Sequence, residues 1–233
     1  MTRGLAIVGH GKMGRLIEQF APEYGFEVRL ALNSGTNTQG AGLTKENLRG
    51  VEAAVEFSTP SAAVQNIRQL AVLGIPVVAG TTGWVQELAC VREAVQSCGG
   101  ALVWSPNFSV GVYRFRQIVA QAAIAFAAER EYQAWGWEIH HGMKRDAPSG
   151  TLLALAEEMK EAGFERDISL SANRAGAHPG THEIGFDSSA DTITIRHTAR
   201  SREGFARGAL RAARWIVGKS GVFEFREIVN ELG

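Results

Sequence analysis

Cysteine is scarce in this sequence, with only Cys90 and Cys98 among 233 residues. Two thiols are too few for a disulfide framework or for a cysteine-rich zinc site. We therefore expect two reduced, packed cysteines and no bound metal. An excess of either charge is also absent, because 24 basic side chains balance 24 acidic ones. Without a block of like charge, a small molecule is a better expected partner than nucleic acid or a membrane surface.

Long apolar runs are missing as well. No stretch reaches the ~20 apolar residues that a membrane-spanning helix needs. The chain starts Met1-Thr2-Arg3-Gly4 and enters an apolar segment at once, without the charged and apolar regions of a secretory signal. We therefore expect a cytoplasmic protein. The composition, 45% hydrophobic and 21% charged, is that of an ordinary globular chain of one large or two small domains.

A glycine-rich turn follows the first apolar segment. Residues 5–8 predict a strand, and residues 15–20 open a helical pattern. Between them lies G-x-G-x-x-G, which binds dinucleotides when it joins a strand to a helix. The first glycine permits a tight turn, the second lets the backbone approach a pyrophosphate, and the third lets the helix pack closely. We predict that this turn holds NADPH or NADH through Gly9, His10, Gly11, Lys12, Met13 and Gly14.

The end of the second predicted strand, residues 26–32, bears on the choice of cofactor. Many dinucleotide-binding folds place Asp or Glu there to hold the adenosine ribose. This chain has Asn33, followed by Ser34 and Gly35. No carboxylate repels a 2′-phosphate and no arginine follows at once to bind one, whereas an amide can hydrogen-bond a ribose or a phosphate. Asn33 is therefore a predicted cofactor contact, and both NADPH and NADH remain open.

Three further strand and helix units follow in the first half. Strands are predicted over residues 53–57, 75–79 and 101–104, and Ser61 is the expected N-cap of the helix between the first two. Alternating strands and helices predict a Rossmann-like, doubly wound parallel sheet, whose ligands lie beyond the carboxyl ends of its strands. The loops at those ends supply the remaining predicted cofactor contacts, which are Gly80, Thr81, Thr82, Ser105, Pro106, Asn107 and Phe108.

The second half predicts a different architecture. A helix over residues 110–130 leads to an alternating strand over 132–139, and a second helix begins at Ser149 or Thr151. Residues 168–172 indicate a strand, and 181–186 with 192–197 a hairpin with one wet face. Strands grouped together beside helices predict a smaller α+β domain with a mixed, largely antiparallel sheet. The buried face of the second helix is expected to be Leu152, Leu153, Leu155, Ala156 and Met159.

A final helix is predicted over residues 201–217. The apolar tail at 221–225, with a short helix after it, is expected to return to the first domain. We therefore predict a dinucleotide-binding domain of residues 1–108 and 211–233. Residues 109–210 form the predicted substrate-binding and oligomerisation domain.

The stretch from Glu138 to Thr151, E-I-H-H-G-M-K-R-D-A-P-S-G-T, gathers chemistry that a packed core does not use. Hydride transfer to a polarised double bond leaves a centre that needs a proton, and His or a perturbed Lys supplies one near neutral pH. His140, His141 and Lys144 offer both types within five positions. A helix that starts near Gly150 presents orphan N–H groups to a substrate carboxylate.

This stretch resembles the signature of the 4-hydroxy-tetrahydrodipicolinate reductases, also called dihydrodipicolinate reductases, which is near E-x-H-H-x-x-K-x-D-A-P-S-G-T. Further matches are G-H-G-K-M-G-R, F-S-T-P, G-T-T-G, N-F-S-V-G-V, R-A-G-x-x-P-G-T-H-E-I and H-T-A-R-S-R-E-G-F-A-R-G-A. The resemblance implies an NAD(P)H-dependent oxidoreductase of lysine and diaminopimelate biosynthesis. It would reduce the dicarboxylate 4-hydroxy-tetrahydrodipicolinate to tetrahydrodipicolinate. The resemblance also implies a homotetramer built through the sheet of the second domain.

Individual roles also follow from the resemblance. His140 is implied as the acid/base residue and Lys144 as the proton donor, although the residues alone leave open which is the immediate donor. His141 is implied to bind substrate, and Gly150 with Thr151 to hold a substrate carboxylate. The chain departs from the family at Asn33, where an acidic residue is common, and in its first glycine turn, where many members have an additional glycine. It is also short for the family, with trimmed loops expected around residues 35–43 and 164–169.

Two other functions fit parts of the sequence. A reductase of an amino-acid semialdehyde that acts by acyl transfer needs a nucleophilic cysteine. Cys90 lies within a predicted helix and Cys98 at its end, so neither is placed for that role. A nucleotide-sensing protein needs the glycine turn but not the cluster of His140, His141 and Lys144, and therefore the cluster favours an enzyme.

Overall fold

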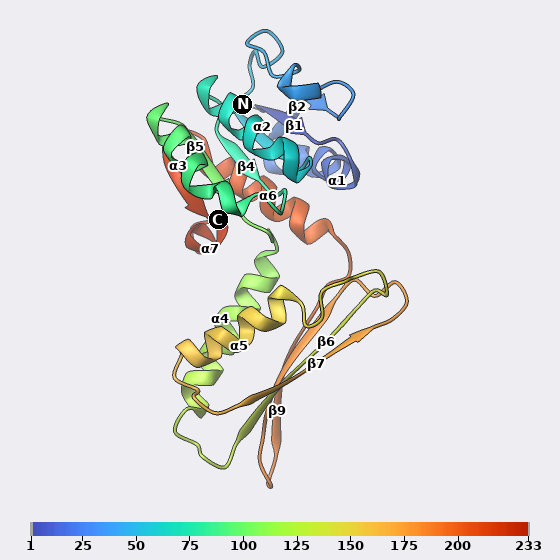
Figure 1. Cartoon of the computed structure of the whole chain (residues 1–233), viewed down its shortest axis with the longest axis vertical. Coiled ribbons are helices and arrows are strands. Elements are labelled where there is room, and N and C mark those ends of the chain that lie inside the picture. Colours follow the sequence, from blue (N-terminus) through green and yellow to red (C-terminus); the bar gives the residue numbers. More distant parts are fainter. Residues whose placement is uncertain (1, 233) are drawn as a thin grey trace. The chain divides into compact units, whose positions relative to one another are not determined.

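The computed structural model describes residues 2–232, and the chain divides into two compact units (Figure 1). The first unit contains Met1–Ser109 and Glu203–Gly233, and the second contains Val110–Arg202. The predicted return to the first domain at residue 211 falls inside one continuous helix, α6 (Glu203–Ile216). The structure places this return at Glu203, because the whole helix belongs with the first unit.

The sheet of the first unit confirms the predicted doubly wound architecture. Within residues 2–232 it has six strands in the order β10-β5-β4-β3-β1-β2, all paired in parallel. Parallel pairing needs crossover connections, and helices supply them here. The strands are β1 (Arg3–Val8), β2 (Phe26–Leu32), β3 (Ala53–Glu56), β4 (Val77–Ala79), β5 (Ala101–Trp104) and β10 (Gly221–Glu224).

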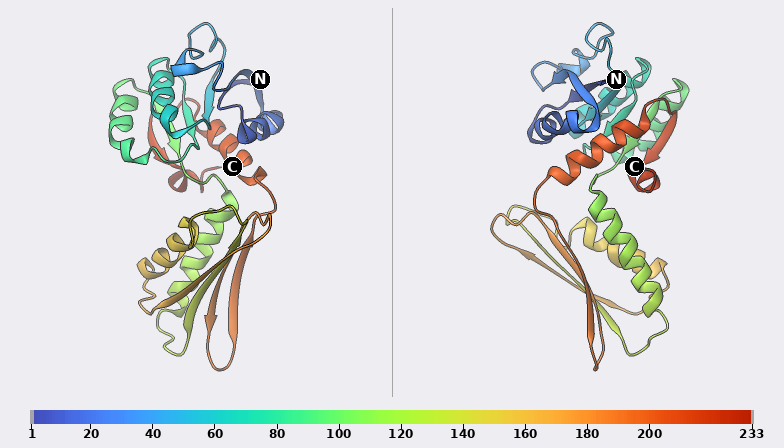
Figure 2. Two further views of the ribbon diagram at one scale, coloured as in Figure 1. Left: turned by 45° about the vertical axis from the view of Figure 1, so that its right-hand side comes forward. Right: turned by 180° about the vertical axis from the view of Figure 1, so that it is seen from behind.

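Helices cover both faces of this sheet. α2 (Pro60–Val72) and α3 (Leu88–Ser97) pack together on one face, while α1 (Lys12–Phe20) and α6 pack together on the other (Figure 2). The shorter helices of the unit are η1 (Ala21–Tyr24), η2 (Thr38–Gly40), η3 (Val85–Glu87) and α7 (Phe225–Ile228).

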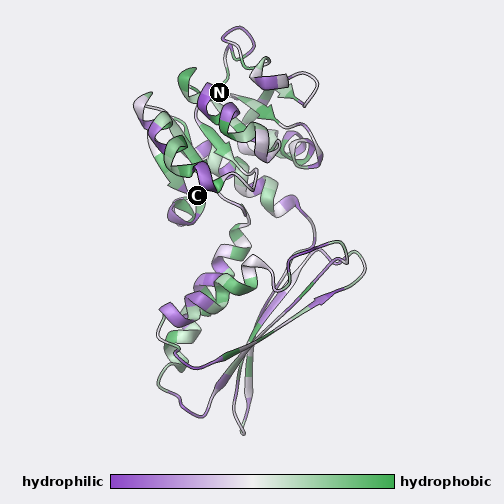
Figure 3. Ribbon diagram, viewed as in Figure 1, coloured by the Kyte–Doolittle hydropathy of each residue, from purple (hydrophilic) through white to green (hydrophobic). Residues whose placement is uncertain are grey.

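The core of the first unit lies between these layers. Its central strands are coloured as hydrophobic in Figure 3, and residues such as Ile7, Val55, Val78 and Val103 are fully buried. Burial of each such side chain contributes about 1.5–3 kcal/mol to folding. Because a central parallel sheet is covered on both faces, its strands carry apolar runs rather than an alternating pattern.

One local prediction in this unit was wrong. The N-cap of α2 is Thr59 and not Ser61, and Pro60 occupies the first helical turn. Proline favours that position because its fixed φ suits the helix and its missing N–H has no intrahelical partner there. The helix therefore begins two residues earlier than the Ser61 cap predicted.

The second unit has the predicted mixed, largely antiparallel sheet, in the order β7-β6-β8-β9. β6 pairs in parallel with β7 and antiparallel with β8, and β8 pairs antiparallel with β9. α4 and α5 contact each other and the sheet (Figure 2). The bounds are α4 (Val110–Phe126), β6 (Gln133–His140), α5 (Gly150–Glu161), β7 (Ile168–Arg174), β8 (Thr181–Asp187) and β9 (Thr192–Thr198).

The buried face of α5 is mostly as predicted. Leu152, Leu155 and Met159 are fully buried, and Ala156 is nearly so. Leu153 was wrongly placed on that face, because it is 50% exposed. Glu157 and Lys160, which follow it at helical spacing, are exposed as well. Within residues 2–232, no helix is both long enough and apolar enough to cross a bilayer.

Candidate active site

The carboxyl ends of β1, β2 and β3 meet at one edge of the first sheet and enclose a cavity of about 300 Å³. The glycine turn and the segment after β2 reach this cavity together with the loop after β3. This is the position at which doubly wound sheets bind their ligands. The residues that line it are Val8, Gly9, His10, Gly11, Asn33, Ser34, Asn37, Phe57, Ser58, Thr59, Ala62 and Asn66.

The glycine turn has the geometry that a pyrophosphate requires. Gly9 adopts φ +98°, a left-handed conformation that L side chains rarely adopt. A Cβ on Gly14 would lie 2.5 Å from the Gly9 carbonyl oxygen, so only glycine lets α1 pack this closely. A Cβ on Gly11 would meet nothing within 4 Å. Open space therefore lies in front of the α1 N-terminus.

The N-terminus of α1 offers donors to that space. The first turn of an α-helix leaves N–H groups without intrahelical partners, and among the described residues no side chain caps α1. Lys12, Met13 and Gly14 provide this first turn. Unpaired amides and the positive end of the helix dipole suit the phosphates of a dinucleotide. These features fit a dinucleotide cofactor.

Asn33 forms a local turn at the end of β2. Its Oδ1 accepts hydrogen bonds from the Gly35 N–H at 2.9 Å and the Thr36 N–H at 3.1 Å. The amide oxygen is therefore committed to the turn. Asn33 is exposed and also lines the cavity. Its NH₂ group, which can only donate, suits either a ribose hydroxyl or a phosphate oxygen.

The other predicted cofactor residues lie at the ends of β4 and β5 and do not line this cavity. The Gly80 N–H is bonded to the Glu56 carbonyl, and the Thr81 carbonyl accepts from the Trp84 indole. Thr82 and Pro106 are exposed, and Asn107 is partly buried. Ser105 and Phe108 are buried. Their roles as cofactor contacts remain predictions.

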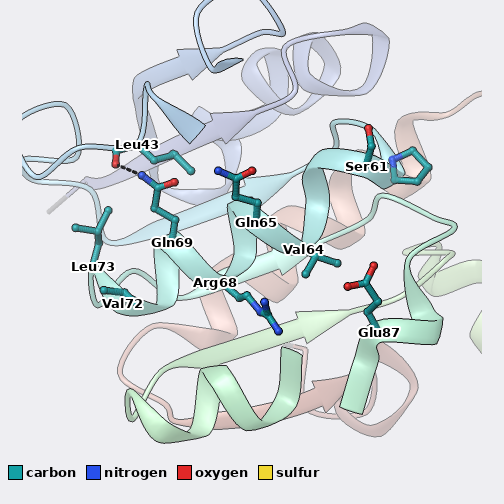
Figure 4. A pocket seen from close by; sticks show the side chains of 10 residues that line it. Leu43, Ser61, Val64, Gln65, Arg68, Gln69, Val72, Leu73 and Glu87 are labelled. Atoms are coloured by element: carbon teal, nitrogen blue, oxygen red, sulfur yellow. Dashed lines mark hydrogen bonds between the residues drawn. The ribbon is translucent and has the colours of Figure 1, made fainter. Parts of the chain in front are cut away.

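A larger cavity, of about 710 Å³, lies along the outer side of α2 (Figure 4). Gln69 lines it and donates to the Leu43 carbonyl at 2.8 Å. None of the predicted site residues lines it, and Arg68 and Glu87 are the charged residues of its lining. The smaller cavity at the glycine turn is therefore the better cofactor site.

In the second unit, β6 delivers His140 and then ends. His140 is the last residue of β6 and is 8% exposed. It lies on the buried face of the strand, as Glu138 does two residues earlier. The ladder continues just beyond it, because the Ala175 N–H donates to the His140 carbonyl at 2.9 Å. His141 lies in the following turn and is half-buried. The strand therefore fixes His140, whereas the turn carries His141.

Glu138 is the centre of a buried polar cluster beside His140. Its carboxylate accepts from the Ser149 N–H at 2.8 Å, from the Ser149 hydroxyl and from Arg174 Nη2 at 2.7 Å. His182 Nε2 lies 3.3 Å from Oε2, and His140 Nδ1 lies 3.7 Å from the same oxygen. Glu138 itself is 0% exposed. One carboxylate therefore connects two histidines, an arginine and a helix N-cap.

Burial and charge set the protonation states in this cluster. Burial by itself raises the pKa of Glu138, but hydrogen bonds from Ser149 and Arg174 outweigh it and leave the pKa below its usual value. Burial lowers the pKa of His140, and Glu138 only partly offsets this. Burial, with repulsion from His140, lowers the pKa of His182 to about 4. Near neutral pH, Glu138 is ionised and both imidazoles are neutral.

Lys144 lies on the loop after β6. Its Nζ is 2.7 Å and 2.8 Å from the two carboxylate oxygens of Asp146, and the hydrogen bond from Lys144 lowers the pKa of Asp146. The Asp146 carbonyl in turn accepts from Arg174 Nη2. Arg174 therefore links the loop that carries Lys144 to the buried Glu138.

A side chain caps the N-terminus of α5. Ser149 is the N-cap, and its Oγ accepts from the Leu152 N–H at 3.3 Å. Gly150 and Thr151 occupy the first turn, where N–H groups lack intrahelical partners. A Cβ on Gly150 would meet nothing within 4 Å, so the space beside it is open. The geometry suits an approaching carboxylate.

The cluster also contains a possible metal-ligand set, in Glu138, His140 and His182. It fits a cation poorly. The Glu138 oxygens already accept three hydrogen bonds, and the Arg174 guanidinium places a positive charge 2.7 Å from Oε1. A metal would have to displace these donors and tolerate the adjacent charge.

Sequence reasoning missed Glu138, Arg174 and His182 as members of the site. Cross-strand register brings them together, because Glu138 pairs with His182 and His140 pairs with Arg174. One signal was present in the sequence. A glutamate two residues before His140 in an alternating strand must share its face.

Known proteins match both units. Sequence models of the dihydrodipicolinate reductase N-terminus and C-terminus match residues 4–108 and 111–229, respectively. The chain is 34% identical over 239 residues to a 4-hydroxy-tetrahydrodipicolinate reductase of Christiangramia forsetii, covering 98% of each protein. It is 36% identical over 256 residues to one of Archaeoglobus fulgidus, covering 94% of this chain and 96% of the relative.

A solved structure of a dihydrodipicolinate reductase has a similar fold. The dipicolinate-bound dihydrodipicolinate reductase from Paenisporosarcina sp. TG-14 superposes with a TM-score of 0.79, at 19% identity and over 99% of each chain. Sequence matches across both units and this common fold agree with the signature around His140. The chain belongs to the dihydrodipicolinate reductase family.

Proposed function

We propose that this protein reduces 4-hydroxy-tetrahydrodipicolinate to tetrahydrodipicolinate in lysine and diaminopimelate biosynthesis, with NADPH or NADH as reductant. The substrate takes up one hydride and one proton and loses one water. The observation that carries the proposal is the grouping of His140, Lys144 and the first turn of α5 around the Glu138 cluster. Family membership supports the same reaction.

The first unit supplies the cofactor site in this proposal. When bound, the reduced nicotinamide dinucleotide supplies the hydride. The α1 N-terminus would bind its pyrophosphate, and Asn33 would contact the adenosine ribose end. The loops at Gly80–Thr82 and Ser105–Phe108 would carry the remaining contacts.

The second unit supplies the substrate and proton contacts. Gly150 and Thr151 would donate N–H groups to one substrate carboxylate, and His141 would bind the substrate beside them. Lys144 would deliver the proton that accompanies the hydride, with His140 as the acid/base residue of the same site. The lowered pKa of His140 keeps its imidazole neutral near pH 7, so that it can accept or relay a proton.

A direct assay tests this function. The protein is mixed with NADPH, or separately with NADH, and freshly prepared 4-hydroxy-tetrahydrodipicolinate, and loss of reduced nicotinamide is followed by absorbance. Substrate-dependent oxidation, with tetrahydrodipicolinate identified by mass spectrometry, is expected. No substrate-dependent oxidation with either cofactor would reject the reductase and favour a nucleotide-sensing protein.

Asn33→Asp should shift the cofactor preference toward NADH. The aspartate can keep the turn, because its carboxylate also accepts from the Gly35 and Thr36 N–H groups. Its charge would repel the 2′-phosphate of NADPH by at least ~1 kcal/mol, so the ratio of kcat/KM for NADPH over NADH should fall about fivefold or more. NADH has no 2′-phosphate and serves as the internal control. An unchanged ratio would mean that Asn33 does not face the adenosine ribose.

We propose that the protein assembles as a homotetramer through the face of the second sheet opposite to α4 and α5. On that face Trp135 lies across Gly185, where a Cβ would clash with the indole. The Trp137 indole donates to Asn173 Oδ1 at 2.6 Å. Both tryptophans are only half-buried in the isolated chain. Large aromatic side chains of this kind are enriched at protein interfaces.

Trp137→Glu should therefore break the assembly. A buried unpaired charge at an interface costs several kcal/mol, so the molar mass measured by light scattering should fall from four chains toward two or one. Leu153→Glu, at an exposed position on α5, provides the matched control and should leave the mass unchanged. An unaltered mass in Trp137→Glu would place the interface elsewhere.

A further inference from the structure

Glu138 contacts both halves of the proposed substrate site. One of its oxygens, Oε2, faces His140 Nδ1 at 3.7 Å and His182 Nε2 at 3.3 Å. The same carboxylate accepts from the backbone N–H and the hydroxyl of Ser149, the N-cap of the helix whose first turn contains Gly150 and Thr151. The acid/base residue and the first turn of α5 therefore lie beside the same carboxylate.

We infer that Glu138 is a positioning residue, whose buried carboxylate holds the His140 imidazole and the first turn of α5 in fixed geometry relative to each other. The inference rests on the proposed function, because that function gives His140, Gly150 and Thr151 their roles. Glu138 does not touch the substrate in this scheme. It acts through His140 on one side and through Ser149 on the other.

The groups around Glu138 stabilise its ionised carboxylate. Arg174 on β7 bonds to Oε1, and His182 on β8 lies beside Oε2. Lys144 and Asp146, paired on the loop after β6, complete the charged groups around His140. Arg174 is the cation in direct contact with the carboxylate. An ionised carboxylate can only accept hydrogen bonds, so His182 must present Nε2–H toward it.

The same logic fixes the orientation of His140. Nδ1 is buried and has no hydrogen-bond partner among the described residues, and Glu138 Oε2 lies 3.7 Å from it. A proton on Nδ1 is stabilised by that carboxylate, which leaves Nε2 to exchange a proton. Nε2 lies on the side of Gly180, where a Cβ would be 2.9 Å away. The missing side chain of Gly180 keeps this reactive edge of the ring uncrowded.

Ser149 connects the carboxylate to the helix. Its hydroxyl donates to Glu138 Oε2 and accepts from the Leu152 N–H at 3.3 Å, while its own N–H donates to Oε1 at 2.8 Å. The N-cap therefore cannot rotate without breaking bonds to Glu138. Since the Gly150 and Thr151 amides follow directly, their direction is set by the same contacts.

Glu138→Gln tests the inference, because the amide keeps the shape of the side chain and removes its charge. Loss of that charge should lower the pKa of His140, raise KM for the substrate and reduce kcat by about tenfold or more. NADH affinity, which depends on the first unit, should be unchanged. The pKa is read from NMR titration of histidine-labelled protein, and KM and kcat from the reductase assay.

Glu158→Gln is the matched control. It removes the same charge from the same unit, in an ion pair with Arg116 on the helices. A merely structural contribution of Glu138 would lower stability without shifting the pKa of His140. An unchanged His140 pKa, together with wild-type KM and kcat in Glu138→Gln, would overturn the inference.

Ser149→Ala covers the case in which Glu138→Gln does not fold. It removes the hydroxyl link but keeps the N–H bond to Oε1, so KM should rise while the pKa of His140 stays near that of the wild type. A wild-type KM in Ser149→Ala would then reject the link to α5. Failure of the proposed function has a different signature, since the wild-type protein itself would not oxidise NADPH or NADH with the substrate.

Discussion

Lys144→Met is expected to lower kcat by about 100- to 10,000-fold, the range over which a positioned general acid contributes. Methionine has a similar length but cannot donate a proton. Lys144 lies on the loop after β6, where its Nζ is held 2.7 Å from Asp146 Oδ1. The loss should therefore appear in turnover and not in folding or in NADH affinity.

Single-turnover measurement with excess enzyme checks this result, because it isolates the chemical step from product release. Lys160→Met is the matched control, since Lys160 is exposed on the last turn of α5. If Lys144→Met retains kcat within threefold of the wild type, the donor is His140. His140→Asn should then carry the whole loss.

The second large effect is expected at the glycine turn. Gly11→Ala should raise the Kd for NADPH and NADH about 10- to 100-fold, while the melting temperature stays within a few degrees. The added Cβ meets no protein atom within 4 Å, but it enters the space in front of the α1 N-terminus. Overpacking there costs about 1–3 kcal/mol only when a pyrophosphate is bound.

Gly9→Ala, in contrast, should lower the melting temperature of the free protein. Gly9 has φ +98°, and its Cβ would clash with the Phe57 backbone, so this substitution destabilises the free protein. Calorimetry of both variants, followed by fluorescence titration with NADH, separates the two effects. Wild-type affinity in Gly11→Ala would show that the pyrophosphate does not approach this backbone.

The strands of the first sheet could be predicted closely from the sequence. Residues 26–32 and 101–104 are strands with the predicted bounds. Their apolar runs and the turns that follow are local signals, and alternation with helices restricts the topology. Errors arose where a tertiary or positional preference prevailed. α2 begins at Pro60, because proline is favoured in the first turn of a helix. Leu153 is apolar but lies on the solvent-facing side of α5.

The candidate site was predictable only in part. His140, Lys144 and the α5 N-terminus lie within one stretch, so a local motif indicates them. Glu138 is connected to Arg174 and His182 through strand register, which pairs residues more than 30 positions apart. Register depends on the burial of whole strand faces. A single sequence does not reveal which distant polar side chains such a face will bring to one carboxylate.

The division of the chain has a consequence for its synthesis. The second unit is continuous from Val110 to Arg202, whereas the first sheet includes β10 (Gly221–Glu224), which pairs with β5. A chain growing from its N-terminus can therefore complete the second unit while β5 still lacks a hydrogen-bonded neighbour on one side. That unpaired edge is a template for association with other strands until residues 221–224 emerge from the ribosome. The order of translation thus leaves the first sheet, and not the second, incomplete until the C-terminal residues have been made.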